Sequence, residues 1–139
     1  MAGTKASETS VEGVVGATIT VWLEPHSLLI RQRIEGSLTP EDYDQLEAKT
    51  EEAVAQLPPG SKVRILADLS DMGPVSLAVR RAGAQRFRPE THKLAAYGGN
   101  RLKSMVHRFL SIVIGQNRMR FFTKEQEARA WLEADMPNA

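Results

Sequence analysis

Apolar and polar residues alternate in two short segments near the start of the chain, residues 17–23 and 26–36. A period of two residues is typical of a strand with one buried face. A Glu-Pro-His-Ser turn joins the two segments, so the pattern predicts a hairpin. We expect the charged face of the second strand to be turned to water; that face carries Arg31, Arg33 and Glu35.

Apolar residues then recur with a helical period over residues 40–57, 74–87 and 100–115, and again after residue 124. Local capping signals mark three of the expected helix starts. They are Thr39 followed by Pro40, Asn100, and a capping box from Thr123 to Gln126. We expect the second helix to turn one apolar stripe inward, formed by Val75, Ala78, Val79 and Ala82.

Further strands are expected between the helices, at residues 62–70, 91–99 and 117–122. The first of these is a continuous apolar run, which is typical of a central strand covered on both faces. Strands that alternate with crossover helices form a parallel sheet. The sequence therefore predicts an α/β fold with a mixed, mainly parallel five-stranded sheet, made of an N-terminal hairpin and three helix-strand units, and four helices. We expect residues 1–16 to be a flexible tail and residues 17–139 to be a single domain.

The composition excludes several classes of site. The chain of 139 residues has no cysteine, which excludes disulfides, thiolate zinc sites and a cysteine nucleophile. His26, His92 and His107 lie far apart and lack metal-ligand spacing, so we expect no metal and no cofactor. No apolar run approaches the roughly 20 residues that span a bilayer, and residues 1–16 lack the apolar core of a signal peptide. We therefore expect a cytoplasmic protein.

Charge is unevenly distributed along the chain. Residues 80–120 contain ten lysines and arginines, and Glu90 is their only acidic residue. Such asymmetry indicates either an anionic partner or oppositely charged faces that cancel across the folded surface. Because the basic residues are scattered over three expected elements with few aromatic residues among them, we do not expect nucleic acid binding.

Three stretches together resemble the STAS superfamily, the sulfate transporter and anti-sigma-factor antagonist domains. Residues 34–54 resemble the end of a strand and the first helix of that superfamily. Residues 63–72 resemble its central strand, which ends in Asp-Leu-Ser, and residues 118–132 resemble its closing strand and helix. The SpoIIAA-like branch is the most similar, and that branch is related in fold to CRAL-TRIO lipid carriers. The resemblance implies a small, non-catalytic cytosolic module that acts through a protein partner.

The resemblance also implies a place for a regulatory serine. Anti-sigma antagonists of this superfamily are switched by serine phosphorylation in an Asp-Ser-Ser-Gly-like turn before the second helix. Here the matching stretch is Gly-Pro-Val-Ser-Leu, residues 73–77, in which Leu77 aligns with the acceptor and Ser76 lies one position before it. A phosphate on Ser76 would be favoured by the helix dipole and by Arg80. The residues alone favour turn and cap roles for Ser70 and Ser76.

Two further segments are candidate sites. Residues 98–103 join the end of a parallel strand to the start of a helix. Backbone amides and cations at such a place can bind a phosphate or carboxylate. The alternative is that the glycines only form a tight turn. The candidate residues there are Gly98, Gly99, Asn100, Arg101 and Lys103. The helix expected over residues 100–115 has more apolar residues than one stripe needs, which fits a wide buried face, a homodimer surface or a lid over an apolar pocket. The candidate residues of this apolar pocket or dimer surface are Met105, Phe109 and Ile112.

The leading hypothesis is therefore a non-enzymatic, STAS-like regulatory module that binds a protein partner and an anionic or amphipathic small ligand. Its expected surface includes Arg80 and Arg81 and the loop at residues 98–103. The alternative is a carrier of a lipid or another apolar molecule, of CRAL-TRIO type. An enzyme ranks third, because no nucleophile-base pair or carboxylate dyad can be placed together.

Overall fold

The structure, a computed structural model, describes residues 16–74, 76–86, 89–98 and 118–134. Its strands are β1 (Thr18–Leu23), β2 (Ile30–Glu35), β3 (Val63–Asp68), β4 (Thr91–Tyr97) and β5 (Met119–Phe122). Its helices are α1 (Asp42–Val54), α2 (Leu77–Gln85) and α4 (Glu125–Glu133). The helix expected over residues 100–115 lies outside the described residues.

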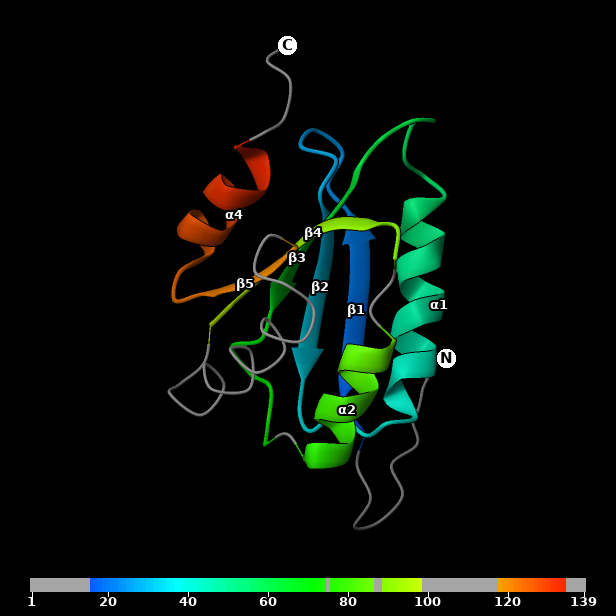
Figure 1. The fold of residues 1–139 in the computed structure, drawn as a ribbon, viewed down its shortest axis with the longest axis vertical. Helices are drawn as coiled ribbons and strands as arrows, with labels where there is room; N and C mark the ends of the chain where they lie inside the picture. The colour runs from blue at the N-terminus through cyan, green and yellow to red at the C-terminus, as the bar shows by residue number, and fades with distance from the viewer. Residues whose placement is uncertain (1–15, 75, 87–88, 99–117, 135–139) are drawn as a thin grey trace.

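The strands form one sheet in the order β1-β2-β3-β4-β5 (Figure 1). β1 and β2 are antiparallel, and the other neighbouring strands are parallel. The predicted fold class, an N-terminal hairpin followed by crossover units in a mainly parallel sheet, is confirmed. Because β2, β3 and β4 run in one direction, the loops that follow them meet at one edge of the sheet.

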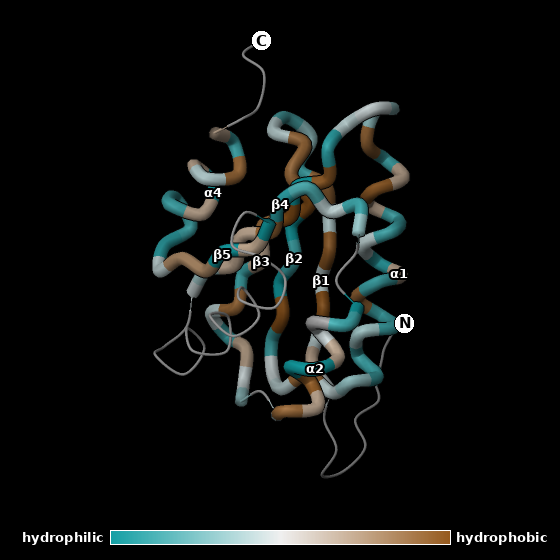
Figure 2. Tube along the Cα trace, viewed as in Figure 1, coloured by the Kyte–Doolittle hydropathy of each residue, from teal (hydrophilic) through white to brown (hydrophobic). Residues whose placement is uncertain are grey.

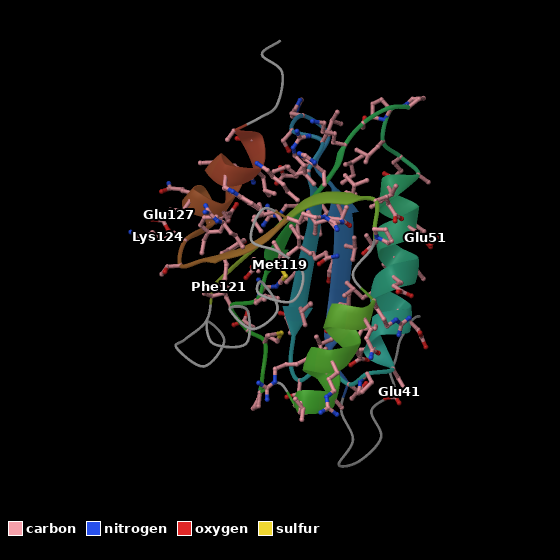
Figure 3. The ribbon with its side chains drawn as sticks, in the orientation of Figure 1. Glu41, Glu51, Met119, Phe121, Lys124 and Glu127 are labelled. Atoms are coloured by element: carbon pink, nitrogen blue, oxygen red, sulfur yellow. The ribbon has the colours of Figure 1, made fainter. Side chains whose placement is uncertain are left out.

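Helices cover both faces of the sheet, α1 and α2 on one face and α4 on the other (Figure 1). β3 lies at the centre and is buried on both faces, as its apolar run predicts. Ile65 and Ala67 face α1 and α2, whereas Leu66 packs with Leu132 of α4. Apolar residues are frequent along β1 and β3, and hydrophilic residues are frequent along α1 (Figure 2). Figure 3 shows Glu51 on the outer side of α1 and Glu127 on the outer side of α4.

The helix starts agree only partly with the capping signals. Thr39 Oγ1 accepts a hydrogen bond from Asp42 N at 3.3 Å, and Asp42 Oδ2 accepts one from Thr39 N at 2.8 Å. This reciprocal pair supports a capping role for Thr39, although α1 begins at Asp42 and Pro40 lies in the preceding turn.

Two expected helix starts were wrong. α4 has Lys124 at its N-cap without a side-chain cap bond, so the Thr123–Gln126 capping box does not form. The helix begins at Glu125, one residue later than the local signal, and its buried residues are Ala128 and Leu132. α2 begins at Leu77 rather than at Pro74 and ends at Gln85.

The prediction of which residues of α2 face inward was also only partly right. Val79 is buried and Ala82 is half-buried, but Ala78 is exposed, because successive residues lie about 100° apart around the helix axis and, of these three, only residues 79 and 82 share the inner side. Val75 lies outside the described residues.

Candidate functional site

The loops after β2 and β3 are joined at the carboxyl edge of the sheet. Gly36 N donates to Asp71 O at 3.0 Å, and Gly73 N donates to Gly36 O at 2.8 Å. A side chain at Gly73 would overlap the Ser37 hydroxyl, so the two loops need a glycine at this approach. This junction holds the segment between β3 and α2 in place, and that segment carries Ser70 and Ser76.

Ser70 and Gly98, both predicted as site residues, are neighbours at this edge. Ser70 N donates to Asp68 Oδ1 at 2.9 Å, which is the Asx turn expected of an Asp-Leu-Ser sequence. Gly98 has a φ of +89°, and a Cβ placed on it would lie 3.0 Å from the Ser70 backbone and would overlap the Ser70 hydroxyl. The close approach of Gly98 brings the ends of β3 and β4 together.

Replacing Gly98 with alanine is expected to destabilise the protein by about 1–2 kcal/mol, because an L side chain is strained at positive φ and the new methyl group meets Ser70. Urea denaturation compares the variant with Gly60→Ala. Gly60 has a φ of +84° but nothing within 4 Å of its added Cβ. A loss no larger than that of Gly60→Ala would contradict the contact with Ser70.

An arginine that was not predicted as a site residue organises the acidic groups at the same edge. Arg33 of β2 donates from Nη1 to Asp68 Oδ2 at 2.6 Å and also contacts Asp71 and Glu35. Burial alone would raise the pKa of Asp68, but hydrogen bonds from Ser70 and the charge of Arg33 hold that pKa below its ordinary value. These carboxylates are engaged in ion pairs and a turn.

The start of α2 presents a polar cap beside an exposed apolar residue. Ser76 is the N-cap, and its Oγ accepts a hydrogen bond from Val79 N at 3.2 Å, so it lies just before the helix rather than in its first turn as expected. The next residue, Leu77, is 47% exposed, and Arg81 is exposed one turn later. Arg80 is half-buried. Arg81 therefore belongs to the outer surface of α2 together with Leu77.

Ser76→Ala is expected to lower the free energy of unfolding by about 1 kcal/mol, because it removes the oxygen that caps the helix. Ser76→Asp keeps an acceptor at this position and is expected to retain wild-type stability. Thermal or urea unfolding of both variants measures the difference. If both variants lost the same stability, the cap would not be the reason.

Comparisons with known proteins identify the family. Residues 29–133 match the family described as SpoIIAA-like. The chain belongs to the SpoIIAA-like family. No curated protein matches it.

Two solved structures share this SpoIIAA-like fold. One is an uncharacterized protein of the DUF3478 family from Shewanella loihica PV-4, with a TM-score of 0.62 and 20% identity over 89% of this chain and 99% of that chain. The other is an anti-sigma factor antagonist from Mycobacterium paratuberculosis, with a TM-score of 0.55 and 17% identity over 84% of this chain and 95% of that chain. At these identities the likeness establishes the fold.

The SpoIIAA-like sheet has a second polar network beneath α4. It corrects the expectation that Arg31 is turned to water with the rest of the charged face of β2, whereas Arg33 and Glu35 remain partly exposed. The Arg31 side chain is only 11% exposed and donates from Nη1 to Glu24 Oε2 at 2.8 Å. Arg129 of α4 binds the same carboxylate through two bonds, at 2.8 and 2.9 Å. The network thus joins the β1–β2 turn to a helix about a hundred residues later.

Tyr97 completes this network. Its hydroxyl accepts a hydrogen bond from Arg31 Nη2 at 3.0 Å and donates one to Glu125 Oε1 at 3.2 Å. Burial raises the pKa of Tyr97 to about 12, so the hydroxyl keeps its proton at neutral pH. The group therefore serves as a fixed donor and acceptor between β4 and α4.

The remaining predicted site residues lie outside the described residues: Gly99, Asn100, Arg101, Lys103, Met105, Phe109 and Ile112. In the part of the chain that the structure describes, no three His, Asp or Glu side chains form a group able to hold a metal ion. None of the helices described is long and apolar enough to cross a membrane.

Proposed function

We propose that this SpoIIAA-like chain is a non-catalytic regulatory module that binds a protein partner through the start of α2. The observation that carries the proposal is the exposure of Leu77, an apolar residue that α2 turns to solvent beside the Ser76 cap. Residues 77 and 81 are one helical turn apart, so Leu77 and Arg81 share a face. Arginine is enriched in protein interfaces, and an exposed leucine beside it adds apolar surface that a partner can bury.

The packing of α2 supports a rigid docking surface. Val79 is 1% exposed, and its carbonyl accepts a hydrogen bond from the Tyr43 hydroxyl of α1 at 3.3 Å. Arg86, just after α2, forms ion pairs with Asp44 and Glu47 of α1. The helix is thus held against α1 on its inner side, and the partner would meet a preformed outer surface, which lowers the entropic cost of binding.

A non-catalytic role is supported by the state of the neighbouring polar groups. Asp68 and Asp71 are paired with Arg33, and the Ser76 oxygen caps α2. A nucleophile or general base would need a positioned reactive partner, such as a histidine beside a serine. The Mycobacterium protein of similar fold is named as an anti-sigma factor antagonist, and the proposal extends this class of protein-directed role to the present chain.

Binding to a purified partner, isolated by cross-linking from the source cells, tests the proposal. Leu77→Asp and Arg81→Glu are expected to weaken the affinity at least tenfold, which is the effect of losing one hot-spot contact. Lys62→Glu is the matched control, because Lys62 is an exposed cation in the loop before β3. Calorimetry that gives the same affinity for all three variants would contradict the proposal.

A further inference from the structure

β1 is an edge strand whose outer backbone groups can be assigned. Glu24 N donates to Leu29 O at 2.9 Å at the start of the hairpin. In an antiparallel pair, residues alternate between bonding to the neighbouring strand and pointing away from it. With the register of Trp22 opposite Arg31, the N–H and C=O groups of Ile19, Val21 and Leu23 therefore point away from β2.

Side chains of α1 bind two backbone groups in the first part of this edge. Lys49 Nζ donates to Ile19 O at 3.0 Å, and Asp42 Oδ2 accepts a hydrogen bond from Ala17 N at 3.0 Å. No described residue forms a hydrogen bond with the outward-facing N–H and C=O groups of Val21 and Leu23. Backbone groups of this kind pair with an extended strand when one is available.

The sequence of β1 lacks the devices that normally protect an edge. Its six residues, Thr-Ile-Thr-Val-Trp-Leu, include no charge and no proline. Trp22 is 40% exposed, and the Arg31 guanidinium lies 5.3 Å from its ring centroid. The free part of the edge thus combines unpaired backbone groups with an aromatic side chain held in place.

We propose that this edge pairs with β1 of a second copy of the chain, antiparallel, about a two-fold axis through Trp22. Val21 of each copy then lies opposite Leu23 of the other, and all of their outward-facing N–H and C=O groups form hydrogen bonds. Ile19 would lie opposite the partner's Pro25, which has no N–H. Lys49 therefore keeps its bond to Ile19 O in the dimer.

The side chains on this axis are self-complementary. Trp22 meets its own symmetry mate at a non-hydrogen-bonded position, where Cα atoms are about 4.5 Å apart and cross-strand aromatic pairs stabilise the sheet. The β1 strands carry no charge, so no like charges meet between them. Because the strand pair is short, the dimer is expected to be weak and to depend on concentration.

Sedimentation equilibrium of the full chain, from about 10 µM to about 1 mM, tests the proposal. The wild type is expected to shift toward the dimer mass. Trp22→Lys removes the aromatic pair and places two like charges on the axis, so the dimer dissociation constant is expected to rise at least about tenfold. Thr20→Lys, on the same exposed face, would lie opposite the partner's Glu24 and is expected to change the constant less than about threefold.

Disulfide trapping checks the register, because the chain has no cysteine of its own. Oxidised Trp22→Cys is expected to form a covalent dimer, since residues on the axis lie within disulfide reach. In Thr20→Cys the introduced thiols would be about 14 Å apart and are not expected to link. Circular dichroism of the reduced variants checks that both fold.

A wild type that stays monomeric over the whole concentration range would overturn the proposal. Equal weakening by the two lysine variants, or equal cross-linking of the two cysteine variants, would also overturn it.

Discussion

Replacing Leu132 with alanine is expected to lower the free energy of unfolding by about 3 kcal/mol. Leu132 has no exposed surface and packs in α4 against Leu66 of β3 and Leu29, which are also fully buried. The truncated side chain would leave a cavity between the helix and the sheet, which the surrounding strands cannot close. Urea denaturation followed by circular dichroism measures the loss.

Two variants of α4 serve as controls for this prediction. Leu132→Met conserves volume and is expected to cost less than about 1.5 kcal/mol. Glu133→Ala changes the adjacent, exposed residue and is expected to change stability by less than about 0.5 kcal/mol. A loss in Leu132→Ala no greater than in Glu133→Ala would show that α4 does not pack on β3 as described.

Hydrophobic periodicity predicted the sheet well, because each strand carries its own signal. The alternation in β1 and β2 and the apolar run in β3 reflect how many faces of each strand are buried. Alternation does not say what covers a face, however. The face of Arg31 was predicted to meet water, yet Arg129 and Glu125 of α4 lie against it, and that helix lies about a hundred residues later in the chain.

Local capping signals predicted the helix starts only in part. Thr39 was predicted as the N-cap of the first helix, and it forms reciprocal hydrogen bonds with Asp42 because both lie in one turn. α2 is capped locally, because Ser76 Oγ accepts a hydrogen bond from Val79 N, whereas Lys124 at the start of α4 forms no side-chain cap bond. Ser76 has the cap role that its residue type favoured, but it lies just before the helix because α2 begins at Leu77 rather than at Pro74.

The sequence named candidate residues but did not indicate how they contact one another. Ser70 and Gly98 were predicted as separate candidates, and the structure places them in contact because parallel strands end at one edge of the sheet. The ion pair of Arg33 with Asp68 depends on the register between β2 and β3. One sequence contains no direct signal for that register, and Arg33 was therefore missed as a site residue.

Glu24→Gln is expected to lower the free energy of unfolding by about 2–3 kcal/mol at pH 7. The Glu24 side chain is 20% exposed and accepts hydrogen bonds from Arg129, Arg31 and Ser27. Glutamine has almost the same shape, but it removes the negative charge and leaves two partly buried arginines beside a neutral group. Glu127→Gln, an exposed change on α4, is the control and is expected to cost less than about 0.5 kcal/mol.

The effect of Glu24→Gln should depend on pH in one direction. The hydrogen bonds from Arg129 outweigh burial and, with those from Ser27 and Arg31, hold the pKa of Glu24 well below its ordinary value of 4.5. The unfolded chain therefore binds this proton more readily than the folded chain. The stabilisation is complete above the unfolded pKa and is lost as the pH falls toward the folded pKa.

Denaturation curves of the wild type and Glu24→Gln at a series of pH values therefore test the ion pair itself. The gap between the two free energies is expected to stay constant from pH 7 to about pH 5 and to narrow below about pH 4.5. The gap between the wild type and Glu127→Gln is expected to stay small throughout, because Glu127 lies outside the network. A gap for Glu24→Gln that remained constant down to pH 2 would mean that the loss comes from altered packing rather than from the charge that joins the β1–β2 turn to α4.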